Sequence, residues 1–148
     1  MNSLQIEKVL NSDLHAKQLF LGVFARDELP TKIKYPSFFI LNTHSRSQPG
    51  EHWLAISYDK NRKAEFFDSY GQSPEFYGLK KYLDTTSSKW NYNKKCLQSF
   101  FSNYCGLYCL FYLYQKSKGI SLFKILKNFE NNNKNDFLIN RFIKKFLH

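Results

Sequence analysis

The sequence has 148 residues, 43% of them hydrophobic, with 15 Phe and 10 Tyr, and this composition excludes a disordered chain. Three cysteines do not make a disulfide framework, and no apolar run is long enough to span a membrane. The amphipathic N-terminus lacks the apolar core of a secretory signal. We therefore expect a single domain over residues 1–148 that is intracellular, neither secreted nor membrane-bound.

The net charge of +10 lies mostly in the second half of the chain. Residues 75–148 carry 13 basic and 4 acidic side chains, whereas residues 1–74 carry 9 and 8. A surface with this bias can attract a polyanion such as DNA. A solvated lysine surface would leave the same pattern, and no nucleic-acid recognition motif accompanies the lysines, so the charge alone leaves both interpretations open.

The N-terminal part of the chain predicts two short helices and a strand. Ser3 and Asp13 are candidate caps for helices over residues 4–11 and 14–19. The apolar run at residues 37–41 predicts a buried strand.

Residues 52–58 and 63–68 predict a β-hairpin, because both segments alternate in polarity and turn-forming residues join them. If the hairpin is centred on residue 60, His52 and Asp68 lie opposite each other on one face, within reach of a hydrogen bond. A slip of one residue would place the two side chains on opposite faces.

The second half of the chain predicts further helices around the sheet. In chain order we expect a helix over 74–84, a strand over 89–95, a buried helix over 105–117 capped by Asn103 or Ser102, an amphipathic helix after Ser121, and a last helix with an apolar stripe of Leu138, Phe142, Ile143, Phe146 and Leu147. The whole pattern predicts an α+β fold, with a central, mainly antiparallel sheet flanked by helices.

Cys105 is the candidate nucleophile because it begins the predicted buried helix. Partial positive charge at a helix N-terminus favours a thiolate, and Gly106 leaves room for a substrate backbone. A buried core cysteine is the alternative, which we prefer for Cys109, one turn deeper in the helix.

His52 is the candidate base, with Asp68 to orient it. His44 competes, but it lies in a polar loop with no carboxylate at a suitable spacing, so we interpret it as a surface residue. Cys96 has no evident base, and Gln98, from the residues alone, is interpreted as a surface side chain.

Four segments together resemble the adenain family of adenovirus maturation proteases, whose relatives occur in virophages and Maverick/Polinton elements. They are Gly50-Glu51-His52-Trp53, Phe67-Asp68-Ser69-Tyr70-Gly71, the lone Gln98, and Cys105-Gly106-Leu107-Tyr108-Cys109. The likeness runs over roughly residues 19–115. It implies a papain-like, adenain-like fold with the nucleophile at a helix N-terminus.

The resemblance also implies a role for each site residue. Cys105 would be the nucleophile, His52 its base, Asp68 the orienting acid and Gln98 the oxyanion donor. Trp53 and Gly106 would border the substrate groove.

The implied function is a cysteine endopeptidase that cuts viral capsid or core precursors during particle maturation. It would act as a monomer, in the infected cell and in the virion, without a metal or a required cofactor. DNA is a candidate activator and partner. A peptide activator linked to an upstream cysteine is not expected, because the only such residue, Cys96, lies two positions before Gln98.

Two alternatives stay open from the sequence. One is an isopeptidase of the same fold that acts on ubiquitin-like or SUMO-like tails, with Trp53 as a groove wall. The other is a non-catalytic basic module that binds DNA or capsid protein, supported by the lysine-rich second half.

Overall fold

A computed structural model describes residues 1–48, 50–99, 103–130 and 134–147. The helices are α1 (Ser3–Asn11), α2 (Leu14–Leu19), α3 (Lys80–Thr86), α4 (Cys105–Ser117), α5 (Leu122–Leu126) and α6 (Lys134–Leu147), with 3₁₀ helices η1 (Arg26–Glu28) and η2 (Pro74–Tyr77). The strands are β1 (Phe20–Phe24), β2 (Ser37–Asn42), β3 (Trp53–Tyr58), β4 (Lys63–Phe67) and β5 (Lys89–Tyr92). None of the helices within the described ranges is both long and apolar enough to cross a bilayer.

The five strands form one sheet in the order β1-β2-β3-β4-β5. The central pairings, β2 with β3 and β3 with β4, are antiparallel, whereas the outer pairings, β1 with β2 and β4 with β5, are parallel. The expected α+β architecture with a helix-flanked sheet is confirmed. The strand β1 had no counterpart among the predicted strands.

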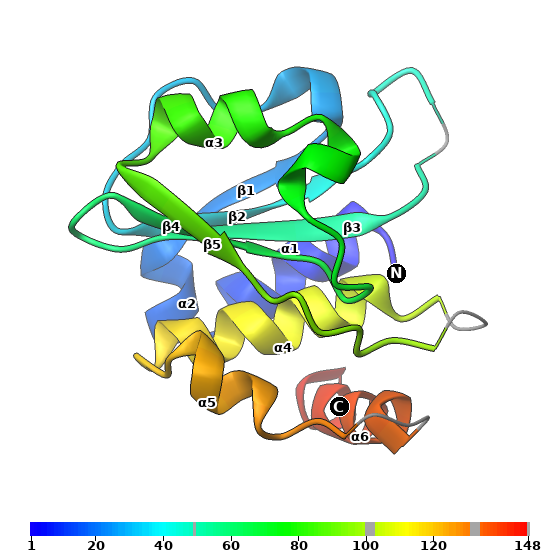
Figure 1. The fold of residues 1–148 in the computed structure, drawn as a ribbon. Helices are drawn as coiled ribbons and strands as arrows, with labels where there is room; N and C mark the ends of the chain where they lie inside the picture. Colours follow the sequence, from blue (N-terminus) through cyan, green and yellow to red (C-terminus); the bar gives the residue numbers. More distant parts are fainter. Residues whose placement is uncertain (49, 100–102, 131–133, 148) are drawn as a thin grey trace.

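Helices cover both faces of the sheet (Figure 1). On one face lies α3, and on the other lie α1, α2 and α4, with α5 and α6 packed beyond α4. Alternation along the strands separates two apolar clusters, because neighbouring side chains point to opposite faces. Phe39 and Ile56 belong to the cluster under α3, while Phe38 and Ala55 pack toward α4.

The predicted β3–β4 hairpin is present, but its register differs by two residues. Ala55 opposes Phe67, which centres the hairpin on residue 61. The cause is a three-residue loop that ends at Arg62, whose φ of 66° is left-handed, a turn usually marked by glycine. Because a shift of two residues keeps every side chain on its face, His52 and Asp68 still share one side of the sheet, as diagonal neighbours.

The predicted helix over 74–84 is wrong as a continuous element. Gly78 breaks it with a left-handed φ of 71°, so η2 ends at Tyr77 and α3 starts three residues later, at Lys80. A Cβ at position 78 would lie 2.7 Å from Nη2 of Arg26, so the break also accommodates that side chain. The predicted strand over 89–95 ends at Tyr92.

The C-terminal part contains the predicted number of helices, but the residues that α6 buries differ in part from the predicted ones. Helix α4 covers the predicted range, and the Ser121 hydroxyl caps α5 by accepting from the backbone N–H of Lys124 at 3.3 Å. In α6 the buried positions are Asn135, Ile139 and Ile143, while Leu138 is 42% exposed, so the predicted stripe was wrong at Leu138. The side chains of Phe146 and Leu147 lie outside the described part.

Candidate active site

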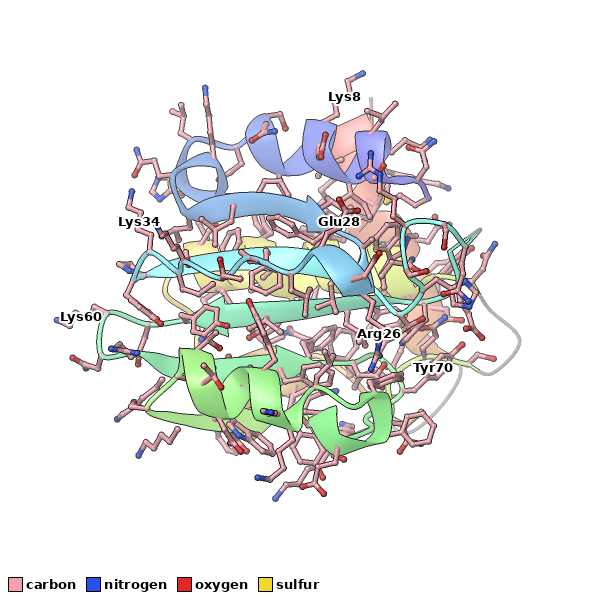
Figure 2. All side chains as sticks on the ribbon, turned by 90° about the horizontal axis from the view of Figure 1, so that it is seen from above. Lys8, Arg26, Glu28, Lys34, Lys60 and Tyr70 are labelled. Carbon is pink, nitrogen blue, oxygen red and sulfur yellow. The ribbon has the colours of Figure 1, made fainter. Side chains whose placement is uncertain are left out.

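Several polar side chains gather at the end of the sheet where β3 begins and β4 ends. Seen from above, Tyr70 marks this end, and Lys60, in the β3–β4 turn, marks the other (Figure 2). The hairpin brings the start of one strand and the end of its neighbour together, and α4 crosses β3 with its N-terminus at the same end. Segments distant in sequence therefore meet there.

Cys105 is the first residue of α4 and is 7% exposed. Of its two predicted caps, Asn103 is exposed and does not occupy the cap position, which Tyr104 holds without a side-chain hydrogen bond. Ser102 lies outside the described residues. The N–H groups of the first turn leave partial positive charge near the sulfur.

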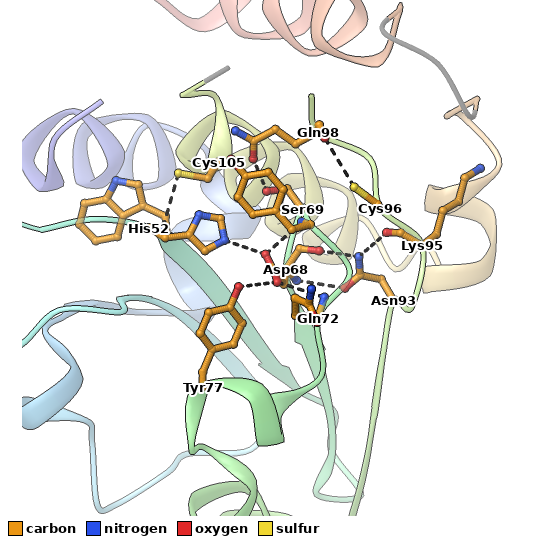
Figure 3. A network of polar contacts seen from close by, with 12 residues as sticks. His52, Asp68, Ser69, Gln72, Tyr77, Asn93, Lys95, Cys96, Gln98 and Cys105 are labelled. Carbon is orange, nitrogen blue, oxygen red and sulfur yellow. Dashed lines mark hydrogen bonds and ion pairs between the residues drawn. The ribbon is translucent and has the colours of Figure 1, made fainter. Parts of the chain in front are cut away.

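The imidazole of His52 lies between Cys105 and Asp68 (Figure 3). Its Nε2 is 2.7 Å from Oδ1 of Asp68. The other ring nitrogen, Nδ1, is on the side of the Cys105 sulfur (Figure 3), and each group affects the pKa of the other. The backbone N–H of Trp53 donates to the same sulfur at 3.5 Å. The structure thus brings together the three residues that the sequence proposed as nucleophile, base and orienting acid.

Asp68 is fully buried and its carboxylate accepts four hydrogen bonds. Oδ1 accepts from His52 at 2.7 Å and from the backbone N–H of Tyr70 at 3.0 Å. Oδ2 accepts from the backbone N–H of Gln72 at 3.1 Å and from the Tyr77 hydroxyl at 2.7 Å. Donors on both oxygens fix the plane of the carboxylate, and with it the orientation of the ring of His52.

The electrostatics favour a thiolate–imidazolium pair. Burial disfavours a charged imidazole, but hydrogen bonds and charge from Asp68 and Cys105 outweigh it and raise the pKa of His52 from 6.5 to about 9. Burial alone would raise the pKa of the Cys105 thiol, but His52 and the N–H groups of Trp53 and Gly106 lower it below its ordinary value. Both shifts stabilise the charged forms at neutral pH.

Asn93, directly after β5, supports Asp68, a role that the sequence did not indicate. Its side-chain amide accepts from the backbone N–H of Asp68 at 3.0 Å and donates to the backbone C=O of Asp68 at 2.7 Å. Asn93 is 2% exposed and follows the last residue of β5. The side-chain amide of Asn93 thus takes the place of a backbone amide and extends the hydrogen bonding between β4 and β5 by one residue. No local sequence pattern reveals such a contact.

The turn that carries Asp68 crosses the loop that leads to Gln98. At Gly71, φ is +75°, and an added Cβ would lie 2.8 Å from the carbonyl carbon of Lys95 and 2.9 Å from the backbone nitrogen of Cys96. Backbone therefore touches backbone at this crossing, and only glycine fits there.

Gln98 is 3% exposed, so the interpretation as a surface residue, drawn from the residues alone, is wrong. Its Oε1 accepts from the Ser69 hydroxyl, and the backbone N–H groups of Leu97 and Gln98 both donate to the C=O of Ser69, at 2.8 and 3.1 Å. With Oε1 engaged by Ser69, the amide nitrogen faces the Cys105 side of the residue (Figure 3). This is the orientation that an oxyanion donor requires.

Trp53 and Gly106, the predicted groove residues, contact each other. A Cβ at Gly106 would lie 3.0 Å from Cδ1 of the indole, which shows how closely the helix approaches the ring. The indole N–H donates to the C=O of Met1 at 3.1 Å. Trp53 borders a hollow that continues to His44, and His52 borders a second hollow, so depressions lie on both sides of the segment before β3.

Two tyrosines beside the imidazole were not predicted from the sequence as part of the site. The Tyr70 ring stacks on His52 with centroids 4.9 Å apart, and the Tyr77 ring lies near-parallel to it at 6.1 Å. Tyr70 belongs to one of the four family-like segments, but Tyr77 lay in a predicted helix whose interruption at Gly78 was not foreseen.

The remaining candidates occupy other environments. Nε2 of His44 lies 2.8 Å from Oε2 of Glu51, so the expectation that no carboxylate suits it is wrong, although it still lies in the loop after β2. Cys109 is fully buried in the core, as expected, and Cys96 is exposed. Within the described ranges, no group of three His, Cys, Asp or Glu side chains could hold a metal ion.

The thiolate–imidazolium pair predicts selective alkylation of Cys105 at mildly acidic pH. At pH 6.5 an ordinary thiol is only about 1% ionised. Because the pKa of Cys105 is lowered while burial and the charge of Asp68 raise that of Cys96, iodoacetamide should modify Cys105 at least about tenfold faster. Mass spectrometry of each cysteine over time measures both rates.

The His52→Ala variant is the control for this result. Without the imidazolium, the Cys105 pKa rises, and its rate at pH 6.5 should fall to that of Cys96. Equal rates in the unmodified sequence, with both cysteines reacting only above about pH 8, would contradict the ion pair.

Comparison with known proteins identifies the family. The profile described as adenovirus endoprotease matches residues 20–129, which contain all four candidate site residues. The chain belongs to this family of cysteine proteases. It is 29% identical over 129 residues to the protease of ovine adenovirus D serotype 7 and 31% identical over 129 residues to that of bovine adenovirus 4. Each alignment covers 72% of this chain and 61% of the relative, so the chain spans about three fifths of the length of these relatives.

Two solved structures are also similar. One is a protease of ASFV, with 26% identity and a TM-score of 0.43 over 64% of this chain and 40% of that chain. The other is the central domain of an uncharacterized protein from Legionella pneumophila, with 14% identity and a TM-score of 0.54 over 98% of this chain and 95% of that one. The second is a likeness of fold alone.

Proposed function

We propose that this chain is a cysteine endopeptidase that cleaves structural precursor proteins of a virus during particle maturation. The observation that carries the proposal is the imidazole of His52, which lies between Asp68, at 2.7 Å from Nε2, and the Cys105 sulfur (Figure 3). Family membership supports proteolysis as the reaction and a viral protein as the substrate.

In the proposed reaction, the Cys105 thiolate attacks the carbonyl carbon of the scissile peptide bond. The oxyanion that forms receives hydrogen bonds from the Gln98 amide and from the backbone N–H at the start of α4. The imidazolium of His52 gives its proton to the leaving amine as the C–N bond breaks, which leaves a thioester on Cys105. Neutral His52 then takes a proton from water, whose oxygen attacks the thioester and releases the acid and the thiolate.

The proposal assigns no metal or organic cofactor, because these side chains supply the nucleophile, the proton and the oxyanion donors. DNA stays our candidate activator on the strength of the basic half of the chain. We further propose that the protein acts as a monomer in the infected cell and the virion.

A proteome-derived peptide library tests the function without requiring that the substrate be identified first. The chain is incubated with the library, and the new N-termini are identified by mass spectrometry. We expect cleavage at a restricted set of sequences, abolished when Cys105 is first alkylated with iodoacetamide at pH 6.5. No cleavage, with or without added DNA, or cleavage that survives alkylation, would refute the proposed function.

A further inference from the structure

The outer oxygen of Asp68, Oδ2, has a partner that no sequence motif indicated. It accepts from the Tyr77 hydroxyl at 2.7 Å, while the other three donors to the carboxylate are His52 and two backbone N–H groups of the turn itself. Tyr77 comes from a separate element, η2, and is the only side chain besides His52 among these four donors. Its contact with Asp68 is therefore a tertiary one.

Tyr77 also reaches the imidazole and the open surface. Its ring lies near-parallel to His52, with centroids 6.1 Å apart and an angle of 25° between the planes. Together with the 68% exposed Phe76 and with Gly78, it lines the hollow beside His52. The left-handed Gly78 ends η2 directly after Tyr77. The Tyr77 hydroxyl points to Asp68 (Figure 3).

We propose that Tyr77 is a positioning residue of the protease: its hydroxyl holds Oδ2 of Asp68 and draws part of the carboxylate charge away from His52. The inference rests on the proposed function, because it concerns how the base of that reaction is adjusted. It adds a residue that acts on His52 through Asp68 and does not itself touch the reacting atoms.

The physical basis is the sharing of one negative charge between competing donors. A donor on Oδ2 stabilises the carboxylate and weakens its attraction for the proton on Nε2 of His52. The imidazolium then releases its other proton more readily, which helps protonation of the leaving amine. Burial and the hydrogen bond to Asp68 raise the pKa of Tyr77, so the hydroxyl keeps its proton at neutral pH and stays a donor.

Other charged groups around the pair must be considered. Four further titratable groups interact electrostatically with His52 or Asp68: Cys105 and Cys109 from α4, Cys96 from the loop after β5 and Tyr70 from the turn after β4. Glu75 from η2, Arg26 from η1 and Glu51 from before β3 line the hollow beside His52. Removal of the Tyr77 hydroxyl changes none of these charges, so its effect on His52 can be measured separately.

The Tyr77→Phe variant tests the proposal, because it keeps the ring and removes only the hydroxyl. NMR titration of the His52 imidazole should show its pKa raised by about half a unit, since Asp68 then interacts more strongly with the ring. On the peptide that the unmodified chain cleaves best in the library, kcat should fall about twofold to threefold, because half a pKa unit makes the imidazolium about threefold weaker as an acid and slows proton transfer to the leaving amine. KM should be unchanged, because only the proton-transfer step is affected.

Tyr82→Phe is the matched control. Its hydroxyl donates to the C=O of Pro30 at 2.6 Å, and it lies on α3 away from Asp68. This variant should leave both the His52 pKa and kcat unchanged. A His52 pKa that is unaltered or lowered in Tyr77→Phe would overturn the proposal even where cleavage persists. The titration needs no substrate, so it decides this point separately from the library experiment.

Discussion

Replacing Cys105 by alanine should reduce peptide cleavage by about 10⁴-fold or more, the largest effect expected of any substitution in this chain. In the proposed reaction the Cys105 thiolate forms the covalent intermediate, and no other described thiol can replace it. Cys109 is fully buried, with a pKa raised well above its usual value by burial, and Cys96 lies beyond Gln98 with no imidazole beside it. Initial rates on the best library peptide measure the loss.

The fold should survive this substitution. Cys105 lies at the first position of α4, where alanine is a good helix residue, and loss of one small side chain costs on the order of 1 kcal/mol. Circular dichroism and urea unfolding check this. Cys96→Ala, at an exposed thiol, is the matched control and should retain full activity. A Cys105→Ala protein that is folded and still cleaves would remove Cys105 from the mechanism.

Replacing Asp68 by asparagine should lower kcat/KM by about 10³-fold at neutral pH. The carboxylate accepts on both oxygens, but an amide has only one. Either orientation of the amide therefore brings its NH₂ group against a backbone N–H, that of Tyr70 or that of Gln72. The negative charge that helps to raise the pKa of His52 is lost as well, so that pKa falls, and with it the population of the ion pair.

The Asp68→Asn variant should also be less stable than the unmodified chain. The mispaired, buried amide costs about 2–3 kcal/mol in the free energy of unfolding, measurable by urea titration. Asp84→Asn is the control, since that carboxylate is exposed on α3 and pairs with Lys80 at 2.7 Å. It should leave activity unchanged. An Asp68→Asn protein with near-normal kcat/KM would show that the buried carboxylate does not orient His52.

Much of the site could be predicted from the sequence, because side chains in a β-hairpin alternate between the two faces of the sheet with a period of two residues. His52 and Asp68 share a face for any even register, so the error of two residues did no harm to that inference. The register itself was hidden because Arg62, and not glycine, adopts the left-handed position of the loop. Cys105 at a helix start followed from the apolar run after it.

What could not be predicted depends on tertiary contacts. Tyr77 reaches Asp68 only because the helix pattern over 74–84 stops at Gly78, and Asn93 supports Asp68 only because β5 pairs in parallel with β4. Local residue patterns carry neither fact. Gln98 resembles any polar loop residue until the Ser69 hydroxyl is known to hold its oxygen. In α6 the spacing of apolar residues predicted that Leu138 would be buried, whereas in the structure Ile139 is buried and Leu138 is exposed.

The backbone contact at Gly71 supports two parts of the proposed active site, the turn that carries Asp68 and the loop that leads to Gln98. The same backbone contact secures the turn of Asp68 and the strand end that leads to Gln98. Fraying there would misplace the orienting acid and the oxyanion donor together. Thermal inactivation of this chain should therefore remove both roles in a single step, and a side chain at position 71 should impair both at ordinary temperature.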